Sequence, residues 1–349
     1  KSAVVAATHS LLITAIGGLF LLVAVLFLSQ FSFNLSQLLI LKSKILVAKY
    51  HYIIIILLLL AAFTKSAQFP FHFWLANAME APTPVSAYLH SATMVQAGIY
   101  LIARFSTIFA QDEIWTYLLL IIPCSTMLLA SILAICSIDL KKMLAYSTIM
   151  ALSLTFSMLA IPNIEMINAA MLFFFTHAIY KSALFLAVGN IDKYAKTKDL
   201  LQLRKKNLAL RYTKITILIC SASMAGIPPF LGFISKELIY IAHLQHHNLM
   251  KIFYLPIVFF NNTIFILIFL ILTYELVLSR NLNYRKILKS IWQSKEKFYK
   301  ACSLVILFLA LISLVFGISP QFIDRNLIYL ADQAILGQQP NANFSLWHG

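Results

Sequence analysis

Charged side chains are scarce in this sequence of 349 residues, of which only 11% are Asp, Glu, Lys or Arg. Ordinary soluble domains carry about 25%. Hydrophobic residues make up 61% of the chain, and apolar stretches long enough to cross a bilayer recur from end to end. This composition excludes an ordinary soluble domain. It predicts an all-α polytopic membrane protein, because a chain in lipid must satisfy its own backbone hydrogen bonds and long apolar segments do so as helices.

Acidic residues are the scarcer of the charged types, with 12 Asp and Glu against 27 Lys and Arg and a formal net charge of +15. The basic residues cluster in short segments between apolar runs: 139–143, 192–214 and 280–300. That distribution is typical of cytoplasmic loops in membrane proteins, and it argues against nucleic-acid binding. The segment 42–49, which holds three lysines, departs from this rule because counting spans places it on the opposite side.

Motifs for cofactors are also missing. The sequence has no G-x-G-x-x-G, no P-loop, no cysteine cluster and no haem-type constellation, so we expect no cofactor, no redox site and no nucleotide hydrolysis in this chain. The four cysteines stand singly within apolar segments, at spacings that suit neither a metal ion nor a disulfide framework: Cys124, Cys136, Cys220 and Cys302.

Nine apolar segments are predicted to span the membrane. They are 10–29, 47–75, 82–104, 115–138, 143–160, 165–189, 213–243, 252–278 and 301–319. We therefore expect a membrane domain over residues 1–320 and a short tail over 321–349. The chain begins with Lys1 and enters an apolar segment at once, without a signal-peptide layout, so we expect either part of a longer chain or an unusual start.

Two of the nine segments, the second and the seventh, are irregular. The second holds Pro70, and the seventh holds Gly226 followed closely by Pro228 and Pro229. Proline removes a backbone donor and clashes with the preceding turn, so a continuous helix is not expected at either place. Interrupted hydrophobic segments that recur at a distance are a sequence indication of transporters built from inverted repeats.

Three lysines lie within apolar segments: Lys65, Lys181 and Lys236. Each costs about 2.5–3.5 kcal/mol on insertion scales. Burial disfavours the charged form of a lysine and a nearby carboxylate favours it, so such a group can take up and release a proton when its partner moves. We interpret the three as a proton relay rather than as lysines that extend to the membrane surface. Lys141 and Lys142 flank a basic loop, and the surface interpretation is preferred for them.

Two histidines lie in the same apolar segments. His177 precedes Lys181 by four residues, so both share one helix face, and histidine titrates near neutral pH. For His90 the residues alone leave open whether it relays protons or is simply hydrogen-bonded to a neighbour. The sequence also leaves open the roles of other polar residues near segment ends: His72, Glu80, Glu237 and Glu275.

Four blocks of sequence together point to a family. They are "TKSAQFPFHFWLANAMEAPTPVSAYLHSATMVQAGIYLIAR" (64–104), "DLKKMLAYSTIM" (139–150), "THAIYKSALFLAVGNID" (176–192) and "GIPPFLGFISKE" (226–237). In this order, they resemble the antiporter-like membrane subunits shared by respiratory complex I and the Mrp-type multisubunit Na⁺(K⁺)/H⁺ antiporters. The first block is more similar to the A-type subunit of the Mrp antiporters than to the complex I type known as chain 5 or the L type.

The resemblance implies an antiporter-like helix bundle of inverted repeats with two discontinuous transmembrane helices. A protonatable residue lies beside each break, and Lys65 and Lys236 match those positions. His90, His177 and Lys181 match positions of a central hydrophilic axis between the half-channels.

The function implied is proton translocation coupled to Na⁺ or K⁺ exchange, in a multisubunit antiporter of a bacterial inner membrane. The partners would be other membrane subunits, and the chain would be a secondary transporter subunit rather than an enzyme. Two alternatives stay open: a non-redox, proton-pumping subunit of an NADH–quinone oxidoreductase, and an inactive structural remnant.

The chain departs from the family pattern in ways that bear on activity. The family has a glutamate on an earlier helix that pairs with the lysine matching Lys65, and this chain begins after that helix. A-type Mrp subunits usually have a lysine where this chain has Gln96, and glutamine cannot take up a proton. They also continue into a long carboxy-terminal part, so we expect this chain to be truncated at both ends.

Overall fold

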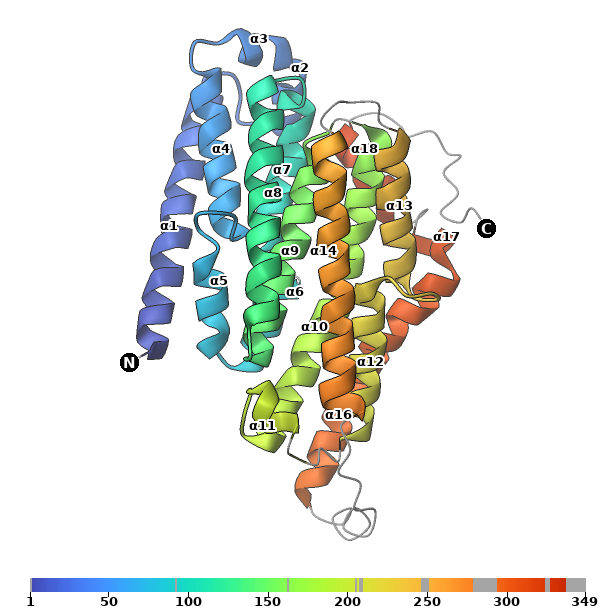
Figure 1. Cartoon of the computed structure of the whole chain (residues 1–349). Helices are drawn as coiled ribbons and strands as arrows, with labels where there is room; N and C mark the ends of the chain where they lie inside the picture. The colour runs from blue at the N-terminus through green and yellow to red at the C-terminus, as the bar shows by residue number, and fades with distance from the viewer. Residues whose placement is uncertain are drawn as a thin grey trace.

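The structure is a computed structural model that describes residues 2–91, 93–161, 163–204, 206, 210–245, 251–278, 294–323 and 327–336. Throughout these residues the regular structure is helical, apart from one isolated β-bridge between Asp139 and Asp199 (Figure 1). The prediction of an all-α protein is therefore confirmed. The basic segment 280–293 and the end of the expected tail, 337–349, lie outside the described residues.

Seven helical stretches are long and apolar enough to cross a membrane, as expected of a polytopic membrane protein. One combines α6 (Thr83–Ser91) with α7 (Gln96–Phe109), and another runs from α14 (Lys251–Leu272) into the π-helix η2 (Thr273–Leu278). The others are α1 (Ser2–Ser29), α8 (Glu113–Cys136), α9 (Leu140–Leu159), α10 (Ile164–Ala195) and α16 (Ser294–Ile318).

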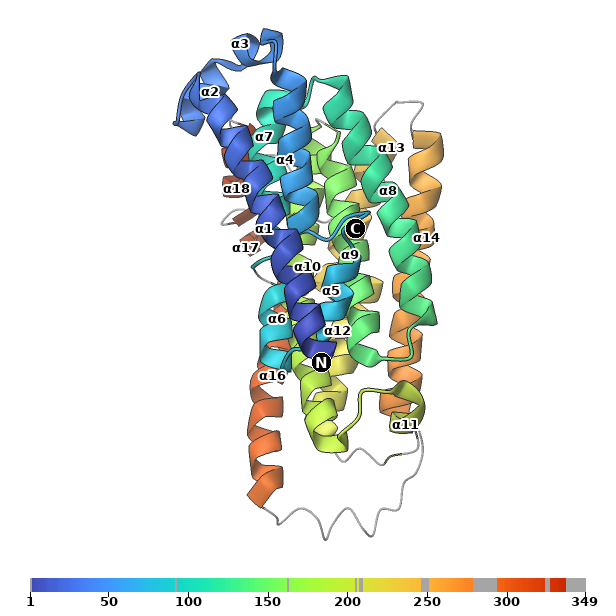
Figure 2. The same cartoon turned by 90° about the vertical axis from the view of Figure 1, so that its left-hand side faces the viewer.

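The two remaining predicted segments are each divided between two shorter helices. Residues 47–75 hold α4 (His51–Lys65) and most of α5 (Phe73–Asn77), and Pro70 lies between them. Residues 213–243 fall in α12 (Arg211–Ala225) and α13 (Leu231–Gln245), and Pro228 and Pro229 lie between those. Figure 2 shows α5 below α4, with the connecting segment between them.

Short helices complete the described chain. They are α2 (Leu35–Ile40), α3 (Lys42–Val47), η1 (Ala78–Glu80), α11 (Leu200–Arg204), α17 (Pro320–Ile323) and α18 (Tyr329–Leu336). The helices α2 and α3 lie at one end of the molecule and α11 lies at the other (Figures 1 and 2). The lysine-rich segment 42–49 is therefore at the opposite end from α11.

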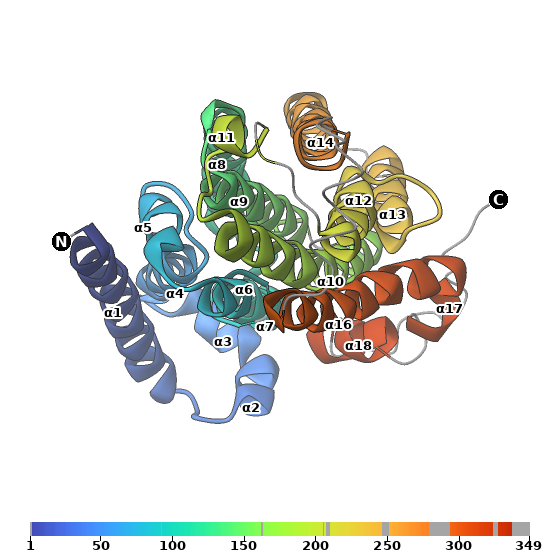
Figure 3. The same cartoon turned by 90° about the horizontal axis from the view of Figure 1, so that it is seen from below.

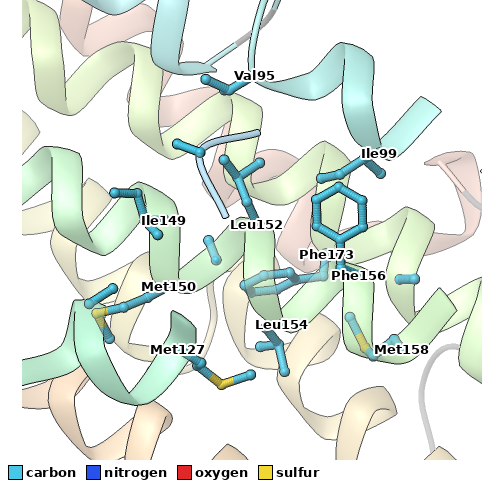
Figure 4. Packing of buried hydrophobic residues seen from close by; sticks show 14 of the residues in the cluster. Val95, Ile99, Met127, Ile149, Met150, Leu152, Leu154, Phe156, Met158 and Phe173 are labelled. Carbon is cyan, nitrogen blue, oxygen red and sulfur yellow. The ribbon is translucent and has the colours of Figure 1, made fainter. Parts of the chain in front are cut away.

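Helix α10 is the centre of the bundle and packs against α6, α9, α12, α13 and α16. Viewed along the bundle, α1 lies at one edge and α13 toward the other (Figure 3). Helix α9 is buried along nearly its whole length. Its apolar side chains meet those of α7, α8 and α10 in the core shown in Figure 4, where Phe156 lies near Ile99 and Phe173. The core therefore holds α10 in fixed register with α7 and α9, which carry the site.

Side-chain caps define where three of these helices begin. Asp112, Asp139 and Asn163 accept hydrogen bonds from backbone N–H groups in the first turns of α8, α9 and α10. Such caps satisfy donors that have no partner within the helix. The start of each central helix is thus determined locally by the sequence.

Helix α1 approaches α4 closely at a single glycine. A Cβ atom at Gly17 would lie 1.9 Å from Oγ1 of Thr64, whereas one at the adjacent Gly18 would meet no atom within 4 Å. We expect Gly17→Ala to lower the free energy of unfolding by about 1–3 kcal/mol, the usual cost of overpacking. Gly18→Ala is the matched control and should be neutral or stabilising, since alanine favours helix.

The measurement is thermal unfolding of the purified protein that carries this chain, in detergent. A fall in melting temperature for Gly17→Ala alone is expected. Equal effects of the two substitutions would contradict the close contact between α1 and α4.

Candidate functional site

The chain leaves α4 through a left-handed residue. Ala67 has φ 51°, and the N–H of Gln68 donates to the carbonyl of Phe63 across 2.9 Å. This bond and the positive φ are those of a Schellman helix end, which satisfies carbonyls that the helix leaves open. The Ser66 hydroxyl then donates to the carbonyl of Val95 across 2.7 Å, which ties the end of α4 to the start of α7.

Polar groups in the segment after α4 find partners on neighbouring helices. The N–H of Phe69 donates to Oγ1 of Thr126 on α8 at 2.9 Å, and the Ser153 hydroxyl on α9 donates to Oε1 of Gln68 at 2.9 Å. Irregular backbone at membrane depth requires such partners, because water is not available to replace them in lipid.

Helix α12 ends in the same way. Gly226 has φ 80°, the N–H of Ile227 donates to the carbonyl of Ala222 at 3.0 Å, and the N–H of Gly226 donates to that of Ser223 at 3.1 Å. These are the two bonds of a Schellman motif. A Cβ at Gly226 would lie 2.7 Å from Cδ of Lys236, so the lysine also packs directly on this glycine.

The lysines occupy different positions relative to the two helix ends. Lys65 is in the last turn of α4, before the left-handed residue, and is half-buried. Lys236 is on α13, after the interruption, and reaches back so that Nζ donates to the carbonyl of Ala225 at 3.1 Å. Its Nζ also lies 4.8 Å from the centre of the Phe265 ring on α14.

Lys181 lies in the centre of the bundle with no exposed surface. Its Nζ donates to the carbonyl of Leu144 on α9 at 3.0 Å and to the hydroxyl of Ser147. Both acceptors are neutral. Across the described residues, none of the three intramembrane lysines forms an ion pair with a carboxylate.

The two histidines lie beside Lys181. His90 on α6 and His177 on α10 are both buried, and Lys181 acts electrostatically on each of them. Nδ1 of His177 lies 3.2 Å from Nε2 of Gln96, and the His90 ring packs 4.7 Å from that of Phe185. The structure therefore brings together three of the five predicted relay residues: His90, His177 and Lys181.

Lys65 and Lys236 belong to the two helix ends rather than to this central group. Among the described residues, neither forms a hydrogen bond or an ion pair with His90, His177 or Lys181. On the side of Lys65, the contact between Ser66 and Val95 reaches the residue that precedes Gln96.

Gln96 is the residue of this site that sequence reasoning did not assign. The sequence shows it only as a departure from a lysine usual in related chains, whereas the structure shows it buried against His177. Its position in the first block of family resemblance was the one available signal. Metal binding has no comparable support, because no cluster of three or more His, Cys, Asp or Glu side chains suited to a metal ion is found in the described part of the chain.

Ion pairs gather at the end of the bundle near α11. Lys141 of α9 pairs with Asp192 of α10 at 2.7 Å, and Lys198 pairs with Asp139 at 3.1 Å and with Glu80 at 3.5 Å. The backbones meet in the β-bridge between residues 139 and 199. The basic segments 139–143 and 192–204 thus lie side by side at one end. Lys141 and Glu80 therefore have structural partners there, which the sequence did not identify.

Lys198 offers a test by pH. Burial lowers the pKa of Lys198, but the hydrogen bonds and charges of Asp139 and Glu80 outweigh burial and hold this pKa above its ordinary value of 10.5. The stabilisation is therefore present below about pH 10.5 and lost as the pH rises through the raised pKa. We expect Lys198→Met to lower the free energy of unfolding at neutral pH by about 1 kcal/mol or less, because the pair is partly solvated.

The melting temperatures of the wild type and Lys198→Met are measured at a series of pH values from neutral to strongly alkaline. The difference in melting temperature between the two proteins should narrow only in the alkaline range. Lys193→Met is the matched control, since Lys193 is exposed and the described residues show no ion pair for it. A difference between wild type and Lys198→Met that persists at the highest pH would contradict the ion-pair explanation.

Comparison with known proteins shows where this architecture recurs. Residues 1–264 match the transmembrane family described as NADH:quinone oxidoreductase/Mrp antiporter. The A1 subunit of the Na(+)/H(+) antiporter of Staphylococcus epidermidis is 35% identical over an alignment of 372 residues that covers 100% of this chain and 46% of that protein. The corresponding Na(+)/H(+) antiporter protein of Bacillus subtilis (strain 168), its A subunit, is 43% identical over 263 residues, covering 70% of this chain and 33% of that protein.

Solved structures agree with these sequence relationships. A chain of the Mrp complex from Dietzia sp. DQ12-45-1b superposes with a TM-score of 0.83 at 32% identity, covering 99% of this chain and 37% of that one. A chain of the membrane-bound sulfane sulfur reductase, an archaeal respiratory membrane complex, superposes with a TM-score of 0.78 at 22% identity, covering 96% and 66%, and shows likeness of fold. The chain spans less than half the length of the curated antiporter subunits that it matches.

Proposed function

Because the chain belongs to the NADH:quinone oxidoreductase/Mrp antiporter family of membrane proteins, we propose that it forms part of a subunit that moves protons across a bacterial plasma membrane. Proton movement would be coupled to exchange of Na⁺ or K⁺ within a multisubunit antiporter. The relatives named as Na(+)/H(+) antiporter subunits and the likeness to a chain of an Mrp complex support this assignment.

The central group of titratable residues is the observation that carries the proposal. Lys181 has no exposed surface and no carboxylate partner among the described residues, and it lies beside two buried histidines. Ionisable groups inside a membrane bundle are costly and mark ion or proton pathways. Neutral acceptors such as the carbonyl of Leu144 hold the ammonium in place without permanently neutralising it, so the proton can leave.

The two divided segments would complete the pathway. We propose that α4 with α5, and α12 with α13, are discontinuous transmembrane helices related by an inverted repeat. Lys65 and Lys236 would pass protons between the central group and the two membrane surfaces. In support, each segment contains a left-handed helix end and an intramembrane lysine, and broken helices are where transporters place their ion sites. A carboxylate for Lys65 would come from another part of the full-length protein or from a neighbouring protein of the assembly.

The test uses the complete assembly that carries this chain, purified and reconstituted in vesicles with a pH-sensitive dye. A pulse of Na⁺ or K⁺ is expected to drive protons in the opposite direction. If cations have no effect and flavin and iron–sulfur subunits copurify, the chain serves an NADH–quinone oxidoreductase instead. If the chain assembles with neither set of partners and moves no protons, it is a structural remnant.

A further inference from the structure

We infer that Gln96 holds His177 in the neutral tautomer whose proton is on Nε2, and so closes Nδ1 as a site of proton uptake. Gln96 is a positioning residue in this inference, since it acts through His177. The inference rests on the proposed function for its biological meaning. The tautomer itself can be observed without any transport.

The orientation of the Gln96 amide follows from its two neighbours. Nε2 of Gln96 lies 3.2 Å from the carbonyl oxygen of Ser91 and 3.2 Å from Nδ1 of His177. A backbone carbonyl can only accept a hydrogen bond, so the amide NH₂ must face Ser91. The opposite orientation would place the Gln96 oxygen against the Ser91 oxygen, two acceptors with no proton between them. Amide orientation is properly assigned from such a network.

The same amide nitrogen then decides the protonation of His177. Because the NH₂ group has two donors and no acceptor, its second N–H can only bond to His177 if Nδ1 presents a lone pair. A neutral imidazole with a bare Nδ1 carries its proton on Nε2. Nε2 of His177 has no hydrogen-bond partner among the described residues, so it does not compete with this assignment.

Uptake of a second proton by His177 would have to occur at Nδ1, the nitrogen that Gln96 occupies. The amide would have to turn away and give up its bond to Ser91. Other groups around His177 give no compensation: Lys181 on its own helix and His90 on α6 are both basic, and the Tyr180 ring packs edge-on at 5.5 Å. The Gln96 amide therefore opposes protonation of His177 at Nδ1.

The contact between Gln96 and His177 is linked to the first helix interruption by a short series of contacts. Gln96 follows Val95, whose carbonyl accepts the Ser66 hydroxyl at 2.7 Å, and Ser66 is adjacent to Lys65. A shift at the end of α4 would reach the start of α7 through this bond. The end of α4 and the residue that precedes Gln96 are therefore in direct contact.

The experiment is ¹⁵N solid-state NMR of the full-length protein in lipid, with labelled histidine. His177 is assigned by difference from His177→Asn. In the wild type, we expect a protonated Nε2 and a bare Nδ1. In Gln96→Leu, which has no donor, the ratio of the Nε2–H to the Nδ1–H tautomer should fall about fivefold, the factor that corresponds to one typical hydrogen bond. Gln96→Glu, which offers an acceptor, should move the proton to Nδ1.

Two further variants separate the effect of the Gln96 amide on the His177 tautomer from a general effect on folding. Gln96→Lys restores a donor and should restore the wild-type tautomer. Asn262→Leu removes a buried amide on α14, whose partner is the Tyr240 hydroxyl, and should leave the His177 signals unchanged. A wild-type His177 with its proton on Nδ1, or an unchanged tautomer ratio in Gln96→Leu, would overturn the inference. Failure of cation-driven proton movement in vesicles would overturn the proposed function and leave the tautomer result standing.

Discussion

Lys236→Met is expected to abolish proton-coupled cation exchange, reducing it by about a hundredfold or more if the lysine carries the proton itself. Lys236 is buried on α13 and its Nζ bonds only to the carbonyl of Ala225 among the described residues, beside the ring of Phe265. The ammonium is the titratable group at the interruption between α12 and α13. Methionine is one atom shorter than lysine but has an atom at the position that packs on Gly226, while the titratable nitrogen is lost.

The variant should still fold. Removing the ammonium leaves one helix-end carbonyl without that donor, and a methionine sulfur packs favourably against an aromatic ring. The measurement is cation-driven proton movement in vesicles that contain the complete assembly, with assembly verified by copurification of the partner subunits. Lys142→Met is the matched control, because Lys142 is partly exposed near the α11 end of α9. Transport at the wild-type rate in an assembled Lys236→Met complex would remove Lys236 from the pathway.

The helical architecture was predictable because lipid leaves an apolar segment few alternatives. The predicted segments 143–160 and 165–189 correspond to α9 and α10 within a few residues at most boundaries. The starts differ because Asp139 and Asn163 cap these helices before their apolar runs begin. Helix α10 also continues past the predicted end at residue 189, to Ala195. The sequence also indicated the interruptions near Pro70 and at Gly226 to Pro229, whereas Pro123 and Pro256 lie inside continuous helices.

The details of the two interruptions were beyond sequence reasoning. The first helix end uses Ala67 in a left-handed conformation, which alanine adopts rarely and which no pattern at this position announces. The sequence places Lys65 before Pro70 and Lys236 after Pro229, but it does not show that Lys236 reaches back to the carbonyl of Ala225. The direction of a long side chain depends on the packing of neighbouring helices.

Contacts between distant segments were equally hidden. Ser147 and Lys181 are separated by 34 residues, and Gln96 and His177 by 81. Family resemblance placed the two histidines and Lys181 on a common axis. It gave no reason to expect that Lys181 would bond to Ser147 or that His177 would lie against Gln96. Neutral partners are chemically ordinary residues, so nothing in their type distinguishes them from the many serines and glutamines that only pack.

Lys181→Met is expected to stop transport while leaving the protein at least as stable as the wild type. A buried charge with only neutral partners carries a desolvation cost, and replacing it with an apolar side chain of similar volume is often neutral or stabilising. The partners it leaves behind remain satisfied, because the Ser147 hydroxyl also donates to the carbonyl of Leu144 at 3.0 Å. Vesicle transport and thermal unfolding are measured on the same preparation.

The combination of the two results separates a relay from a structural lysine. If Lys181 were retained for packing, its loss would lower the melting temperature, and any loss of transport would follow from damage to the fold. If it is retained for proton transfer, transport falls while the melting temperature holds or rises, which is the trade expected where function keeps an unfavourable group in place. Lys193→Met on the same helix is the control, since this exposed lysine should change neither quantity. A less stable but fully active Lys181→Met complex would reverse the assignment, because the lysine would then stabilise the fold and take no part in proton transfer.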